Sequence, residues 1–440
     1  MANDLTQGSI LGSIRRFSLP YMLSYFLQIL YGLADLVIIG LYCDVDSTTA
    51  VSNGAQVMHM FTVIIIGLAM GSTVRIGRAV GAGESRQVSR LIGDTIVLFS
   101  LVAIVSTVAL LVSDKAIVHL INTPQEAVRG TVNYLAICFA GIPFIISYNI
   151  IASIFRGMGD SKSPMWFVAV ACVVNIALDF LFIGYLGMGP AGAALGTTLS
   201  QVVSVIVAVA TVRKRHLFPK IDLRPDFRSM SDILKVGLPI SLQDGFLQVS
   251  FIIITIIANS RGLVDAAAVG IVEKFIGLIF IVPSAMLATV SAISSQSFGA
   301  NRPERARQAM KISIAIAAGF GVVASILFQF IPDFAVSLFT NDSEVIVRGA
   351  EYLRSYVWDS VLAGIHFCYS GLFTACGCAM ISFIHNFISI LVRVPFAYFA
   401  SAAFAASLYP MGWASPVGSL VSVLICIAAY AWMRRRGIIN

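Results

Sequence analysis

The stretch Phe17-Ser-Leu-Pro20 returns later in the chain as Val236-Gly-Leu-Pro239, and Phe155-Arg-Gly-Met-Gly159 returns as Phe373-Thr-Ala-Cys-Gly377. The offset between the two copies is almost constant, because the two pairs of motifs differ in offset by a single position. A constant offset of this kind indicates a fold made of two copies of one structural unit. The duplication therefore decides the architecture, and each further motif has to be assigned to one copy or the other.

Composition assigns both copies to a membrane. Hydrophobic residues make up 58% of the 440 residues and charged residues 12%, whereas soluble proteins contain about 25% charged residues. One transmembrane helix needs about 20 mostly apolar residues. Runs of this kind predict twelve spans, at 17–40, 52–77, 92–112, 132–155, 165–184, 191–212, 236–258, 266–297, 312–331, 352–374, 381–405 and 413–433.

Six spans per copy is an even number, so both copies enter the membrane in the same orientation, related by a pseudo-two-fold axis along the membrane normal. We therefore predict an all-α membrane protein with twelve transmembrane helices in two six-helix bundles. The N-terminal lobe is predicted at 1–212, a cytoplasmic linker at 213–235 and the C-terminal lobe at 236–440. Two lobes around a central cleft suit the alternating access of a transporter, whereas an enzyme or a receptor has no evident need for this symmetry.

Basic residues predict the orientation of the chain. Clusters around Arg90 and Arg305 and the run Arg434–Arg436 lie in alternate loops, which assigns these loops and both termini to the cytoplasm by the positive-inside rule. Topology thus accounts for the net charge of +7, and we expect no nucleic-acid partner. The polar residues 1–13 lack the features of a cleaved signal peptide, so the first helix is expected to remain as an anchor.

The first copy carries oxygen-bearing side chains inside its predicted spans. A carboxylate at the bilayer centre costs at least about 2.5 kcal/mol, so Asp35 and Asp179 are expected to have a partner or a function. Asn175 lies four residues before Asp179 and on the same helical face, and Thr197 lies on the next span. Such oxygens suit a small hard cation, or a proton on one carboxylate. The alternative interpretation is that these carboxylates cap or bridge helices.

The second copy lacks this oxygen cluster. In the register that matches Phe155 with Phe373, the opposing positions hold one basic and two apolar residues, namely Arg393 (opposite Asn175), Ala397 (opposite Asp179) and Ile253 (opposite Asp35). Coupling chemistry is therefore expected to differ between the two lobes.

Charges of both signs occur instead in the second copy, among them Asp244, Glu273, Lys274, Asp359 and Arg393. We interpret Lys274 and Arg393 as salt-bridged structural residues. Asp359 and Glu273 are candidates to attract a cationic substrate in the cleft. The sequence alone is compatible with a structural or a functional role for the whole set.

Three further residues of the first copy are candidates for a role in transport. Pro20 lies early in the first helix, where its missing N–H and its ring favour a bend that would connect helix shape to Asp35. An ordinary position near the helix start is the alternative. Tyr31 and Phe61 are candidates for cation-π contacts with a substrate, or for packing.

These motifs together resemble the multidrug and toxic compound extrusion (MATE) family over nearly the whole chain. The resemblance rests on Phe155-Arg-Gly-Met-Gly-Asp160, on Asn175-Ile-Ala-Leu-Asp179 and on the turn that leads to Thr197. It is closest to the prokaryotic branch with a cation site in the N-terminal lobe. It implies that Asp35, Asn175, Asp179 and Thr197 form the coupling site, as metal ligands if Na+ is the ion, and that Pro20 is the bending proline.

The resemblance implies an antiporter that exports amphipathic organic cations and drugs in exchange for inward H+ or Na+. The alternative is a flippase for a lipid-linked or polysaccharide precursor, which a cationic cavity would favour. An enzyme is not expected, because the five histidines are scattered without metal-binding spacing or a partnered nucleophile. We expect a monomer in the cytoplasmic (inner) membrane of a prokaryote, with small organic cations and lipid as partners and no cofactor besides the coupling ion.

Overall fold

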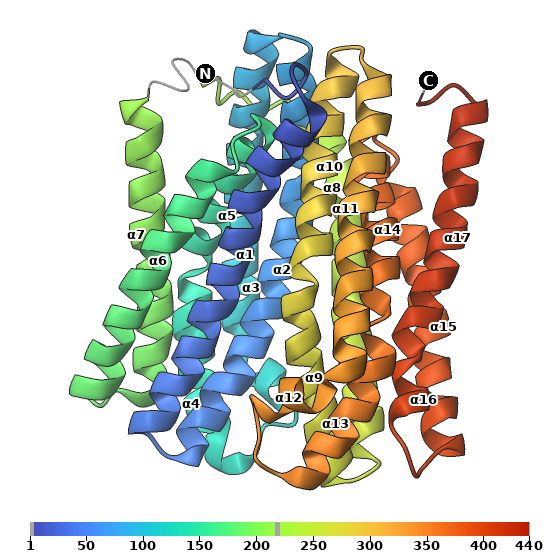
Figure 1. Cartoon of the computed structure of the whole chain (residues 1–440). Coiled ribbons are helices and arrows are strands. Elements are labelled where there is room, and N and C mark those ends of the chain that lie inside the picture. Colours follow the sequence, from blue (N-terminus) through green and yellow to red (C-terminus); the bar gives the residue numbers. More distant parts are fainter. Residues whose placement is uncertain (1–3, 216–220, 440) are drawn as a thin grey trace. The chain divides into compact units, whose positions relative to one another are not determined.

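In the part of the chain that the structure describes, all regular secondary structure is helical. The computed structural model describes residues 4–215 and 221–439, and within them no strand occurs (Figure 1). A bilayer offers no water to backbone amides, and helices satisfy these groups internally. The predicted all-α class is confirmed.

The helices follow one another along the chain in the order and colours of Figure 1. They are α1 (Ile10–Tyr42), α2 (Val45–Gly81), α3 (Ser85–Leu120), α4 (Gln125–Ala140), α5 (Ile142–Gly157), α6 (Lys162–Asp179), η1 (Phe180–Tyr185), α7 (Gly189–Lys214), α8 (Phe227–Asn259), α9 (Leu263–Ile279), α10 (Ile281–Gly299), α11 (Pro303–Phe330), α12 (Pro332–Ser337), α13 (Ser343–Tyr356), α14 (Asp359–Ala375), α15 (Ala379–Ala403), α16 (Tyr409–Gly412) and α17 (Ala414–Arg435).

Within residues 4–215 and 221–439, ten helices are long and apolar enough to cross a membrane when continuous pairs such as α9 with α10 count as one, and the pair α4 and α5 adds an eleventh. This pair is bent by 50° around Gly141. The span predicted at 352–374 differs, because the chain breaks between α13 and α14 and α13 carries four charged residues. Both copies thus interrupt the same helix, since Asp359 stands opposite Gly141 in the register of the repeat.

Contacts divide the chain into two compact units. Unit 1 contains Leu19–Gly237, and unit 2 contains Leu5–Ser18 and Leu238–Asn440. The first turns of α1 therefore belong to unit 2, and the first turns of α8 belong to unit 1. Each change of unit falls directly before a helix-interior proline, Pro20 in α1 and Pro239 in α8. Since a proline removes one helical hydrogen bond, both copies weaken the helix where it leaves one unit for the other.

The lobe limits that the sequence suggested, 1–212 and 236–440, stay a prediction. Part of the linker predicted at 213–235 is already helical, because α8 begins at Phe227. Residues 216–220 of this linker lie outside the described residues.

Each unit has its own apolar core. In unit 1 the core includes Phe99, Phe139 and Phe155, each at most 1% exposed. In unit 2 it includes Val269 and Leu353, both fully buried. Aliphatic and aromatic side chains on several helices converge in each case, so each unit can hold polar groups away from water.

Within unit 2, two arginines hold the N-terminal segment in place. Arg305 donates hydrogen bonds to three of the carbonyl oxygens of residues 5–8, and Arg302 donates to the fourth, each at 2.8 Å. The N–H of Leu5 donates to Gln296 Oε1 at 3.0 Å. The basic loop after α10 thus fixes the segment that leads into α1.

Within unit 1, the segment before α8 is held in a similar way. Asp226 forms an ion pair with Arg90 at 3.0 Å, and its N–H donates to Asp94 Oδ1 at 3.0 Å. Gly93 lies so close to the carbonyl of Asp222 that a Cβ atom there would overlap it. The first turns of α3 and of α11, the third span of each copy, therefore both bind the segment that opens the other copy.

Two glycines allow α2 and the start of α8 to touch backbone to backbone. A Cβ at Gly71 would overlap the carbonyl oxygen of Ile233, and a Cβ at Gly237 would overlap that of Leu68. Small residues permit such close helix contacts in membranes. The contact lies entirely within unit 1.

Gly237→Ala is expected to destabilise the protein by about 1–3 kcal/mol, because the new methyl group overpacks this contact. The matched control is Gly319→Ala on α11, where no atom lies within 4 Å of the added Cβ. Alanine should be neutral or slightly stabilising there. The measurement is the midpoint of thermal unfolding in detergent, and equal midpoints for the two variants would contradict the close contact.

Candidate functional site

Three helices of unit 1 bring the predicted oxygen cluster together. Asp35 comes from α1, Asn175 and Asp179 from α6, and Thr197 from α7. Asp35, Asn175 and Asp179 are 5%, 1% and 0% exposed. Thr197 Oγ1 donates a hydrogen bond to Asp35 Oδ2 at 3.3 Å, although the two residues are far apart in sequence. Asp179 and Asn175 are the other neighbours of the Asp35 carboxylate.

Most oxygens of this cluster have no hydrogen-bond donor in the described part of the chain. This holds for Asp35 Oδ1, for both carboxylate oxygens of Asp179 and for the amide oxygen of Asn175. Buried polar atoms are normally paired, and exceptions call for an explanation. Two adjacent carboxylates away from water also repel each other when both are ionised. The arrangement therefore favours a shared proton or a small cation among the oxygens.

Gly196 is a further residue of the site, and sequence reasoning missed it. A Cβ at this position would overlap Asp179 Oδ1 and would lie 3.6 Å from Asn175 Nδ2. The absence of a side chain therefore lets α7 approach the two polar residues of α6. The available signal was the concentration of small residues before Thr197, where Leu195 is the one large residue between Ala191 and Gly196, because small residues mark close helix contacts.

The chain departs from regular α-helix directly after Asp179. Residues 180–185 form the π-helix η1, and the N–H of Leu186 donates to the carbonyl of Leu181 at 2.9 Å. Single π-turns within helices are frequent at functional sites. Gly187 and Gly189 then adopt φ values of +63° and +54°, which glycine adopts without strain, and lead into α7. The sequence therefore builds a sharp turn that returns Thr197 towards Asp179.

The other candidates of the first copy lie on α1 and α2. Tyr31 is one helical turn before Asp35 on α1. Phe61 packs against the core of unit 1. Pro20 lies within α1, which runs continuously from Ile10 to Tyr42, and its carbonyl accepts a hydrogen bond from Ser24 Oγ at 3.0 Å.

The charges of unit 2 are arranged differently. Asp359 on α14 and Arg393 on α15 form an ion pair at 3.7 Å, with side chains only 1% and 7% exposed. Glu273 on α9 is half-buried and Lys274 is exposed. Asp244 on α8 accepts a hydrogen bond from Gln243 Nε2 at 3.3 Å. A substrate-attracting role for Asp359 and Glu273 stays a prediction.

A buried histidine in unit 2 was not anticipated from the sequence. His385 is fully buried, and its Nε2 and Nδ1 lie 2.8 Å from Ser370 Oγ and 2.6 Å from Ser422 Oγ. Both ring nitrogens are thus satisfied by hydroxyl groups, as expected for a histidine that stabilises packing. The spacing in sequence gave no signal, because the three residues come from three different helices.

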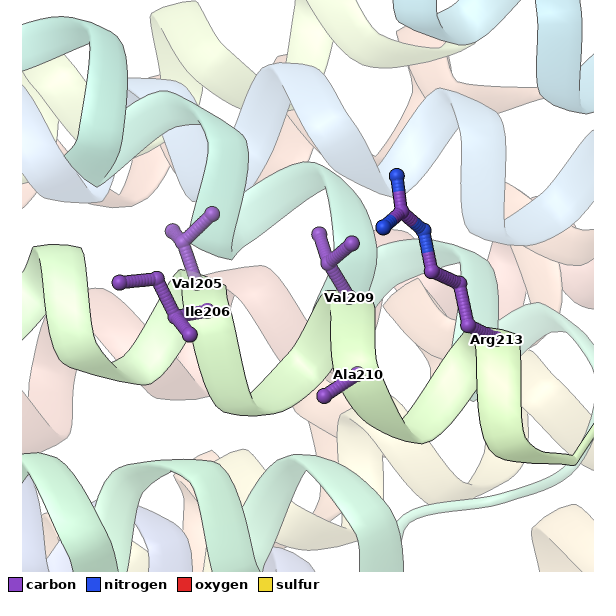
Figure 2. A pocket seen from close by; sticks show the side chains of 5 residues that line it. All are labelled: Val205, Ile206, Val209, Ala210 and Arg213. Carbon is purple, nitrogen blue, oxygen red and sulfur yellow. The ribbon is translucent and has the colours of Figure 1, made fainter.

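A pocket on α7 differs in character from the oxygen cluster. It is lined by Val205, Ile206, Val209, Ala210 and Arg213 (Figure 2). Aliphatic side chains with one basic residue near the helix end are typical of a face that meets lipid. The pocket contains no carboxylate, so it is not the candidate cation site.

The duplicated membrane helices and the buried oxygen cluster define a multi-pass membrane transporter rather than an enzyme. The chain belongs to the MatE family, whose sequence model matches residues 20–181 and 239–399, one stretch in each copy. The family predicted from the motifs is confirmed.

Known relatives cover almost the whole chain. "Probable multidrug resistance protein YoeA" of Bacillus subtilis is 26% identical over 97% of this chain and 95% of its own length. "Multidrug export protein MepA" of Staphylococcus aureus is 24% identical over 83% of this chain and 81% of its own. A solved structure described as "Crystal structure of MATE in the straight conformation" has the same fold, with a TM-score of 0.89 and 24% identity over 98% of this chain and 97% of that chain.

Asp179→Asn is expected to raise the thermal unfolding midpoint of the purified protein at alkaline pH without Na+, by the equivalent of about 1 kcal/mol or more. The substitution removes one of two adjacent buried charges, and functional sites commonly lower stability in this way. Asp359→Asn is the matched comparison, because it leaves the buried Arg393 without its partner and should cost about 3–5 kcal/mol. The reverse order of midpoints would contradict this assignment of charges.

Proposed function

We propose that the chain is a secondary antiporter that exports amphipathic organic cations, drugs among them, in exchange for inward H+ or Na+. The observation that carries the proposal is the buried cluster of Asp35, Asn175, Asp179 and Thr197, whose oxygens largely lack donors in the described part of unit 1. A family of transporters and relatives named for multidrug resistance and export support the direction and the kind of cargo.

The chemistry of the cluster suits both ions. Na+ prefers hard oxygen ligands, and carboxylate, amide and hydroxyl oxygens are of this kind. A proton instead neutralises one carboxylate and lets it donate a hydrogen bond to the other. In either case the bound cation removes the repulsion between Asp35 and Asp179, so binding draws α1 and α6 together at this level.

Antiport follows if drug and coupling ion favour different states of the protein. Linkage then requires that each ligand weakens the binding of the other by the same factor. A ligand that binds both states equally shifts neither and drives no transport. Pro20, where α1 passes from unit 2 to unit 1, is the position at which a change of helix shape has the lowest backbone cost. Tyr31, one turn before Asp35, is a candidate substrate contact.

We further propose that the chain works as a monomer in the cytoplasmic membrane of a prokaryote with both termini in the cytoplasm. Within unit 2, Leu5 binds Gln296, and Ile439 packs in one cluster with Phe298 and Met433. Leu5 and Ile439 therefore both lie at the end of unit 2 that carries the basic residues after α10. The positive-inside rule assigns such an end to the cytoplasm.

Asp35→Asn and Asp179→Asn are expected to reduce gradient-driven export of a fluorescent organic cation from proteoliposomes at least about tenfold, equivalent to about 1.4 kcal/mol. Each variant removes one of the two carboxylates that bind the coupling ion. Imposed pH and Na+ gradients, applied separately, identify the ion. If wild-type protein moves no organic cation under either gradient, the antiport proposal fails, and flipping of a lipid-linked precursor becomes the hypothesis to test.

Gly196→Ala is expected to lower the same export strongly while the protein stays folded, because the new Cβ displaces the Asp179 carboxylate. Gly40→Ala on α1 is the matched control, since no atom lies within 4 Å of its added Cβ. Export by Gly196→Ala equal to that by Gly40→Ala would show that the position of this carboxylate does not matter.

A further inference from the structure

At one equivalent position, the first copy carries a neutral amide and the second copy carries a positively charged guanidinium. Asn175 of α6 and Arg393 of α15 are equivalent in the register of the repeat. In each unit a glycine of the following long helix faces this position. Gly196 of α7 lies against Asp179 and Asn175, and a Cβ at Gly418 of α17 would lie 2.8 Å from the carbonyl oxygen of Ser389 and 3.2 Å from the Cβ of Arg393. Asn175 and Arg393 therefore both lie where a glycine lets the following long helix approach closely.

The guanidinium group of Arg393 lies near α14, the copy of α5, and near α8, the copy of α1. It is 3.7 Å from Asp359 of α14 and 5.7 Å from the ring centre of Phe251 on α8. The helix α8 is the copy of α1, and in the register that matches Pro20 with Pro239 the residue opposite Asp35 is Ile254, three residues after Phe251. Asp359 itself stands opposite Gly141. Unit 2 has thus lost the two carboxylates of unit 1 and gained one cation with one carboxylate.

The charges of this pair balance each other within a nearly dry environment. As whole residues, Asp359 is 1% and Arg393 is 5% exposed. Neither carboxylate oxygen of Asp359 accepts a hydrogen bond from the described part of the chain. A guanidinium stays protonated at every accessible pH and cannot dissociate from its helix. The charge of Arg393 also acts on Glu273 of α9.

We propose that Arg393 is the built-in cation of unit 2, which permanently occupies the counterpart of the exchangeable cation site in unit 1 and keeps Asp359 from binding H+ or Na+. The inference rests on the proposed coupling role of unit 1 and deepens it, because it makes Arg393 the residue that confines ion exchange to one unit. Asp359 then neutralises Arg393 and does not attract substrate.

The test uses the purified full-length protein with Asp35→Asn, which disables the site of unit 1. Binding of radioactive Na+ and the infrared carbonyl band of a protonated carboxylic acid report the two possible cations. With Arg393 present, no uptake that depends on Asp359 is expected. Adding Arg393→Gln should create uptake of one cation per chain, as Na+ or H+, and Asp359→Asn should abolish it. Arg393→Lys, which keeps a tethered cation, should create none.

Uptake that depends on Asp359 while Arg393 is present would overturn the proposal, and so would a folded Arg393→Gln protein that gains neither cation. If Arg393→Gln does not fold, the double variant Arg393→Gln/Asp359→Asn should fold, because removing both members of a buried pair avoids an unpaired charge. A double variant no more stable than the single one would also contradict the proposal. Cation binding is read without any drug, so these outcomes are independent of whether the protein exports organic cations.

Discussion

Asp35 and Asp179 are two carboxylates that lie next to each other away from water, and their mutual repulsion is the constraint on which the rest of unit 1 depends. Gly196 lets α7 pack closely against the Asp179 carboxylate. The turn after η1 brings Thr197 within hydrogen-bond distance of Asp35. The apolar core around them excludes water and strengthens every charge interaction inside. A bound cation or proton removes this repulsion, and we propose that the ligand state of the site thereby affects helix packing.

The two copies share their helix arrangement but differ in the charged residues that they bury. Both units keep the same helix order, the same break at Gly141 and Asp359, and the same exchange of first segments before Pro20 and Pro239. They differ at the position of Asn175 and Arg393, where one unit carries an amide beside two carboxylates and the other a guanidinium. Under our proposals, the charge of the unit 1 site changes with its bound cation, whereas the cation of unit 2 is fixed because it belongs to the Arg393 side chain.

Sequence patterns with a local cause were predictable. The spacing of four residues between Asn175 and Asp179, the cost of burying Asp35 and the repeated proline motif were visible in one dimension, and the helical membrane fold and family that they indicated are confirmed. Features that depend on contact between distant helices were not predictable. One such feature is the close approach of Gly196 to the Asp179 carboxylate, where any side chain would overlap an oxygen. Another is the ion pair of Asp359 with Arg393 on a different helix. The assignment of the coupling site itself stays a prediction.

The central claim is that cation and drug compete through the cluster of unit 1. The most direct measurement is the number of H+ or Na+ ions released when an organic cation such as tetraphenylphosphonium binds to the purified protein, read by calorimetry in buffers of different ionisation enthalpy and Na+ content. The account predicts release of about one cation per bound drug in wild-type protein and none in Asp35→Asn. Drug binding that is independent of both pH and Na+ in the wild-type protein would contradict it.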